Sequence, residues 1–86
     1  MLDHEPEVLG VLSTRSIGRG HLDLRVVAFD DHPPVVENRA FIRDRVTGEE
    51  RVGRNKGLTL LDMELLVAHW PHIKALLLSK SGGAAA

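Results

Sequence analysis

Alternate positions near the middle of this chain carry side chains that suit one kind of chemistry: Arg39, Phe41, Arg43 and Arg45. On an extended strand, residues two apart point to the same face, so these four side chains would share one surface. Guanidinium groups neutralise phosphates, and an aromatic ring can stack on an unpaired base. The pattern therefore predicts a strand face that binds single-stranded nucleic acid, with Phe41 as the stacking platform.

Further cations are expected to extend this surface. Arg54 and Lys56 follow on the next predicted strand, and Arg15 and Arg19 lie at a predicted flanking loop. The alternative interpretation is a solvated sheet face, in which arginines pair with acids across strands and Phe41 is tucked against a neighbouring strand. A water-facing aromatic residue between arginines favours the binding interpretation, because exposed apolar surface usually has a use.

The charge balance leaves a second function open. The formal net charge is -1, although residues 15–56 contain nine basic and seven acidic side chains, so the positive charge is concentrated in the middle. A nearly neutral protein gains little long-range attraction to a polyanion. The alternative function is therefore a dimeric protein-interaction module, in which the same sheet face or the acidic N-terminal arm docks a protein.

The elements that must position these residues follow from apolar patterning and turn residues. Segments 7–14, 21–29, 35–46 and 50–60 have strand character, and they are separated by Gly-rich, Pro-rich and Thr-Gly turns. Gly10 marks a bulge or a close-packing point, and Gly53 and Gly57 are expected to bend the last strand. Segment 61–78 has helical character, with Thr59 and Asp62 near its start. The sequence predicts an α+β fold, with a four-stranded antiparallel curved sheet followed by a C-terminal helix (ββββα).

The predicted helix is apolar on nearly all sides, so it needs covering on both sides. The sheet can cover one side, and a second copy of the chain is the economical source for the other. We therefore expect a homodimer formed through the helix, without choosing which arc faces the partner. The predicted interface residues are Leu61, Leu65, Leu66, Trp70, Ile73, Leu76 and Leu77. Pro71 should either kink the helix or split it near His69 and Trp70.

Composition and length argue against several other classes. The 86 residues fit one domain, at 7–80, with an N-terminal arm at 1–6 and a flexible tail at 81–86. The lack of cysteine excludes thiol catalysis, disulfides and thiolate zinc sites. With no membrane-length apolar run and an acidic start, we expect a cytoplasmic protein, associated with the nucleoid if its host is bacterial.

No motif predicts catalysis or a cofactor. His69 and His72 are three residues apart, but Pro71 between them distorts the spacing that a shared metal needs. The acids at 30, 31, 49 and 50 lie beside turns, where solvated carboxylates are the norm, and no glycine-rich phosphate loop opens a helix. We expect a non-enzymatic protein without metal or cofactor.

Two short motifs resemble a known family. Ile42-Arg43 on the third predicted strand is followed by Lys56-Gly57-Leu58-Thr59-Leu60 before the helix. This arrangement resembles the positive cofactor four family of single-stranded DNA-binding transcriptional coactivators, and most of all its bacterial YdbC-like branch, over residues 7–78. In that family an Asp-Ile-Arg strand motif precedes a Gly-Lys-Gly-Ile-Thr-Leu segment. Here Phe41 stands in place of the acid, and Arg45 stands where an aromatic residue is usual.

The resemblance implies a ββββα fold, a dimer made through the helices, and a curved sheet surface that binds single strands with little sequence preference. Arg43 matches the motif arginine, and Arg54 and Lys56 match the basic pair near the glycine. The expected function is that of a transcription cofactor or an accessory protein of DNA repair and recombination. The stacking argument applies to DNA and RNA alike, so both remain candidate ligands.

Overall fold

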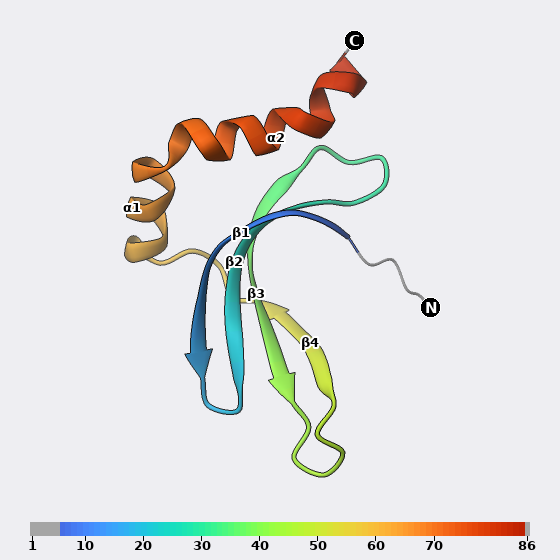
Figure 1. Ribbon diagram of the computed structural model, residues 1–86, viewed down its shortest axis with the longest axis vertical. Helices are drawn as coiled ribbons and strands as arrows, with labels where there is room; N and C mark the ends of the chain where they lie inside the picture. The colour runs from blue at the N-terminus through green and yellow to red at the C-terminus, as the bar shows by residue number, and fades with distance from the viewer. Residues whose placement is uncertain (1–5, 86) are drawn as a thin grey trace.

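The structure, a computed structural model, describes residues 6–85, with side chains described as far as Ser79. Residues 1–5 of the predicted arm, and Ala86, lie outside the described residues. The elements in chain order are β1 (Glu7–Ile17), β2 (Gly20–Ala28), β3 (Val35–Arg43), β4 (Glu50–Asn55), α1 (Leu60–Ala68) and α2 (Trp70–Ala85) (Figure 1). The strands form one antiparallel sheet in the order β1-β2-β3-β4. The structure confirms the predicted α+β fold, and the predicted C-terminal helix is divided into two helices, α1 and α2.

Strands β1, β3 and β4 end at residues other than the predicted ones. β3 ends at Arg43 because the carboxylate of Asp44 accepts hydrogen bonds from the backbone N–H groups of Val46 (2.7 Å) and Thr47 (2.9 Å), which folds the chain into a turn. β4 ends at Asn55, five residues before the predicted end. β1 continues beyond the predicted residue 14 to Ile17.

The cross-strand register divides the sheet into two faces. Val26 pairs with Gly10 and Val36, and direct partners point to the same face. A Cβ built on Gly10 would lie 2.8 Å from Cδ1 of Leu76 in α2, so α2 lies against this face. The register also shifts between Val8 and Gly10, which confirms both roles predicted for Gly10. We call the opposite side of the sheet the open face.

The break between the helices falls where it was predicted. His69 lies between the helices as the C-cap of α1, and its carbonyl oxygen accepts a hydrogen bond from the N–H of Ile73 in α2 at 3.1 Å. Pro71 is the second residue of α2, where the proline's missing N–H removes no helical hydrogen bond. α2 continues to Ala85, through most of the segment for which a flexible tail was predicted. Neither described helix combines the length and apolar character needed to cross a membrane.

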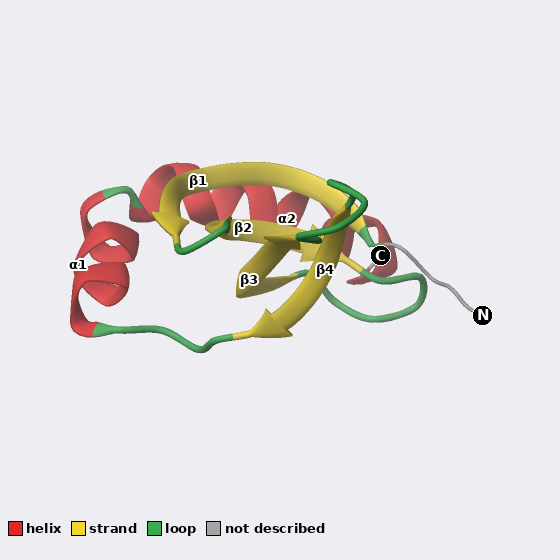
Figure 2. Ribbon diagram, turned by 90° about the horizontal axis from the view of Figure 1, so that it is seen from below, coloured by secondary structure: helices red, strands yellow, loops and turns green. Residues whose placement is uncertain are grey.

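The helices and the curved sheet enclose a small core. Figure 2 shows the bending of β1 and the position of α2 along one side of the sheet, with α1 at one end. Among the described residues, the fully buried large side chains are Leu24, Val26, Val27 and Ile73, and Val27, which pairs with Val8 and Val35, lies on the open face. α2 makes its sheet contacts mainly with β2. The helix layer is therefore attached through Ile73 and its neighbours, and α1 lies beside the sheet rather than across it.

Candidate nucleic-acid interface

The open face carries the residues that the sequence singled out, together with several that it did not. His21 pairs with Phe41, Asp23 with Arg39, and Arg25 with Glu37, which places all six side chains on the face opposite Val26. Burial decreases along this face toward the hairpin ends. Arg25 and Glu37 are buried, Arg39 and Phe41 are half-buried, and Arg43 is exposed.

An ion-pair network occupies the buried part of the open face. Glu37 is 2% exposed, and its two carboxylate oxygens accept hydrogen bonds from Nε of Arg25 (2.8 Å) and Nη2 of Arg39 (2.5 Å). Nη1 of Arg39 also donates to the carbonyl oxygen of Gly53 at 3.0 Å. Burial alone would raise the pKa of the Glu37 carboxyl, but the hydrogen bonds and charges of the two arginines outweigh burial and hold the pKa below 4.5. Arg39 was predicted to neutralise phosphate, and instead it contributes charge to this internal network.

The ring of Phe41 already has two close neighbours. His21 stacks on it with ring centroids 5.1 Å apart, and Cζ of Arg25 lies 5.0 Å from the Phe41 centroid. His21 in turn lies 3.7 Å from the carboxylates of Asp23 and Glu50. The solvated-face interpretation predicted cross-strand charge pairs and a Phe41 packed on a neighbouring strand, and these contacts match both features. The half-exposed ring still presents part of its surface to solvent.

Arg43 and Arg19 come together at the hairpin end of the sheet. The backbone N–H of Arg43 donates to the carbonyl oxygen of Arg19 at 3.0 Å, and both residues line a shallow depression beside His21. The guanidinium of Arg43 donates to the carbonyl oxygen of Gly48 at 3.1 Å, across its own hairpin. Both arginines are exposed. The structure thus brings these two predicted residues together, although Arg19 lies in the β1–β2 turn and Arg43 at the end of β3.

Arg45 does not extend the open face as predicted. It follows the end of β3 and lies in the turn organised by Asp44, where it is exposed. The alternation of β3 therefore stops at Arg43. The same turn bonds to the Asp44 carboxylate lower the pKa of this acid below its ordinary value, chiefly through the backbone N–H of Thr47.

Arg54 and Lys56 lie at the far edge of the sheet, along β4 and just after it. We call these two exposed cations the basic edge, because β4 is an edge strand of the sheet. Arg51 of β4 is also exposed, but it pairs with Ile42 and therefore lies on the face of Val26. The N–H of Lys56 donates to the carbonyl oxygen of Asn38 at 2.8 Å, so the backbone is held in line with β3 beyond the end of β4. The basic edge runs beside Val52, the direct partner of Phe41.

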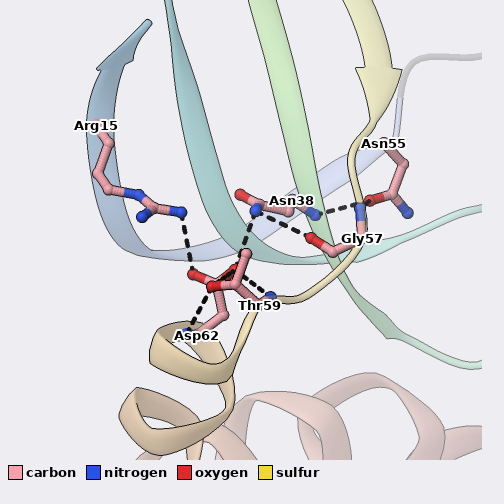
Figure 3. Close-up of polar contacts among 6 residues, drawn as sticks. All are labelled: Arg15, Asn38, Asn55, Gly57, Thr59 and Asp62. Carbon is pink, nitrogen blue, oxygen red and sulfur yellow. Dashed lines mark hydrogen bonds and ion pairs between the residues drawn. The ribbon is translucent and has the colours of Figure 1, made fainter.

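Arg15 lies away from the other predicted binding residues. It belongs to β1 rather than to a flanking loop, and its Nη2 lies 3.4 Å from Oδ1 of Asp62 in α1 (Figure 3). The prediction that Arg15 and Arg19 share a loop is therefore wrong, since Arg19 alone occupies the turn. The extension of β1 is the reason, because it carries Arg15 alongside β2, opposite Leu22.

A polar cluster joins the sheet to α1, and we call it the clamp. Its members are Arg15, Asn38, Asn55, Gly57, Thr59 and Asp62 (Figure 3). Asp62 is 4% exposed, and its Oδ2 accepts hydrogen bonds from the Thr59 backbone N–H (2.8 Å), the Thr59 hydroxyl (3.0 Å) and Nδ2 of Asn38 (3.2 Å). The Thr59 hydroxyl in return caps the N–H of Asp62. Oδ1 of Asn55 accepts bonds from the N–H groups of Asn38 and Gly57, as Figure 3 shows. The clamp ends β4 and directs the chain into α1.

Most of the residues predicted to form a dimer interface leave apolar surface exposed. Leu61 is 67% exposed and Trp70 49%, while Leu65, Leu66, Leu76 and Leu77 are half-buried. Ile73 is 1% exposed and packs in the core of its own chain, so it offers no area to a partner. Other exposed apolar side chains on the helices are Leu60, Met63, Val67 and Leu78.

The residues that the sequence did not bring into the site are His21, Arg25, Phe29 and Glu37. Strand alternation in 21–29 puts Arg25 and Phe29 on one face, but the contacts of Arg25 depend on the β2–β3 register. Within the described residues, histidines and acids form no cluster of three or more that could hold a metal. No family model, curated protein or solved structure matches the chain.

Proposed function

We propose that this protein is a homodimeric single-stranded DNA-binding protein with little sequence preference, acting as a transcription cofactor or as an accessory in repair and recombination. The observation that carries the proposal is the position of half-exposed Phe41 between two groups of exposed cations. Arg19 and Arg43 lie at the hairpin end, and the basic edge lies along β4. A strand crossing the open face would place phosphates near these cations and a base near the aromatic ring.

The second copy of the chain is supported by the apolar surface of the helices. Val67, at 76% exposed, and Leu61 lie on α1, while Trp70 begins α2. Exposed apolar side chains on both helices are costly in water, and the described core is small for a chain of this length. A helix-to-helix dimer would cover this surface and leave both open faces accessible, one on each protomer.

An anisotropy titration tests the proposal. A fluorescein-labelled 20-residue oligothymidylate is titrated with protein at several salt concentrations, beginning at low salt. We expect binding at micromolar protein or below, with a log-log dependence of affinity on salt whose slope is about -0.7 for each phosphate contacted. Failure to bind at micromolar protein in low salt would overturn the proposal.

Charge variants tie the binding to the surface. Replacing Arg54 and Lys56 together with alanine should make the salt slope shallower by up to about 1.4 if each cation contacts one phosphate. Lys74→Ala is the matched control, because Lys74 is an exposed cation on α2, away from the sheet edge. Equal slopes for the parent and the double variant would remove the basic edge from the binding surface.

The charge balance favours a second candidate, a dimeric protein-interaction module. Glu37 neutralises part of the open-face charge, and exposed cations on an edge strand also discourage unwanted strand pairing. This candidate predicts no affinity for oligothymidylate at low salt and leaves the same surfaces for a protein partner. The oligonucleotide titration therefore separates the two functions.

A further inference from the structure

We propose that a pocket on the open face accepts a single nucleobase, so that bound strands are held by insertion of a base and not only by stacking on a flat surface. The pocket has a volume of about 430 Å³, within the range of small-molecule sites. This inference rests on the proposed single-strand binding and adds to it the group that enters the protein and the residues that surround that group.

Five of the eight residues that line the pocket are apolar, and two of these five are aromatic. They include Val8 of β1, Phe29 after β2, Phe41 of β3 and Val52 of β4. The four residues come from every strand region of the sheet, whose curvature Figure 2 shows, and all four line the same pocket. Two aromatic rings and two aliphatic side chains suit a flat, uncharged ring system, whose faces gain from stacking and from apolar contact.

The charges around the pocket are balanced, and this balance favours an uncharged base over a phosphate as the occupant. Arg25 and Arg39 contribute two positive charges, and Glu37 beneath them and Glu50 at the lining contribute two negative charges. Both guanidinium groups already donate to Glu37, and Arg39 also donates to Gly53. A phosphate would meet no net positive charge here. A base brings no charge, and its edge carries donors and acceptors that match the carboxylate of Glu50 and the remaining guanidinium N–H groups.

Residues outside the pocket would then bind the phosphates. Arg43, Arg19 and the basic edge are exposed and lie outside the pocket walls. The surface is thus divided into a neutral pocket for a base and peripheral cations for the backbone. Base insertion should add affinity without adding to the salt dependence, because no counterion is released when an uncharged group binds.

The test compares oligothymidylate with an abasic deoxyribose-phosphate strand of equal length, using the full chain. The pocket-filling variant Val52→Trp keeps all charges and both phenylalanines. We expect the parent to prefer oligothymidylate and Val52→Trp to lose about 5- to 150-fold in affinity for it, the range that one base stack supplies. Its affinity for the abasic strand and its salt slope should stay those of the parent.

Two further variants complete the test. Phe29→Ala should lose affinity for oligothymidylate in the same way, whereas Val46→Ala, at the exposed hairpin, should bind like the parent. Unchanged or tighter binding by Val52→Trp would overturn the pocket, because a flat stacking surface would tolerate or gain from an added ring. A parent that binds neither strand would instead overturn the proposed function. Circular dichroism spectra matching that of the parent show that each variant has folded.

Discussion

Replacing Asp62 with alanine should lower the free energy of unfolding by about 1.5–4.5 kcal/mol, because Asp62 supports both the start of α1 and its attachment to the sheet. Loss of the reciprocal cap with Thr59 costs about 0.5–2 kcal/mol. The buried bond from Asn38, at 3.2 Å, contributes about 1–1.5 kcal/mol. The Arg15 pair adds at most about 1 kcal/mol, since the Arg15 side chain is 44% exposed and its charge is screened by water.

Urea unfolding followed by far-ultraviolet circular dichroism measures this loss. All variants are compared at one protomer concentration, because the stability of the proposed dimer would depend on concentration. Glu64→Ala is the matched control, an exposed acid on the same helix, and should change stability by no more than about 0.5 kcal/mol. Asp62→Ala behaving like Glu64→Ala would refute the clamp as the link between sheet and helix.

Three other perturbations have defined outcomes. The pKa of Glu37 is lowered in the folded protein, so its charged form stabilises the fold above pH 4.5, and this contribution is lost as the pH falls further. Glu37→Gln should therefore lose less stability in acid than the parent. Urea midpoints measured from pH 6 to pH 3 check this. Gly20→Ala should lower the free energy of unfolding by about 1–3 kcal/mol in the same assay, because the added Cβ would overlap the carbonyl oxygen of Phe41 and push β2 away from β3. A urea midpoint equal to that of the parent would contradict this packing. In the proposed helix-to-helix dimer, Val67→Asp at an exposed helix position should shift sedimentation toward the monomer, and a variant that sediments like a dimeric parent would place the contact elsewhere.

Local sequence signals predicted the elements well where side chain and backbone preferences agree. Thr59 and Asp62 marked the start of α1, and Pro71 marked the break that follows His69. Gly10 was recognised as a bulge or close contact because a glycine inside a strand rarely has another purpose. The start of α1 and the break between the helices depend on residues within a few positions of one another.

Strand ends were harder to predict because side chains compete with the sheet for backbone hydrogen bonds. Asp44 takes two N–H groups and ends β3, which moves Arg45 off the open face. Asn55 bonds to the backbone of Asn38 on a neighbouring strand, a contact that local pattern alone does not reveal. The predicted arginine surface was accordingly too long at one end.

The composition of the candidate site depends on register, which alternation leaves undetermined. Alternation placed Arg25 on one face of β2, but only the pairing of β2 with β3 puts it opposite Glu37 and near Phe41. That pairing turns Arg39 from a predicted phosphate contact into part of an internal ion-pair network. Arg43 was predicted correctly as an exposed cation because it lies at the end of the strand, beyond the network.

The most direct measurement is a nuclear magnetic resonance titration of the ¹⁵N-labelled protein with oligothymidylate. Single-strand binding at the open face predicts that amide shifts concentrate in β2, β3 and the basic edge, including His21, Phe41 and Arg43. The amides of α2, on the other side of the sheet, should stay nearly unchanged. Shifts confined to the helices, or no shifts at saturating oligonucleotide, would contradict the account.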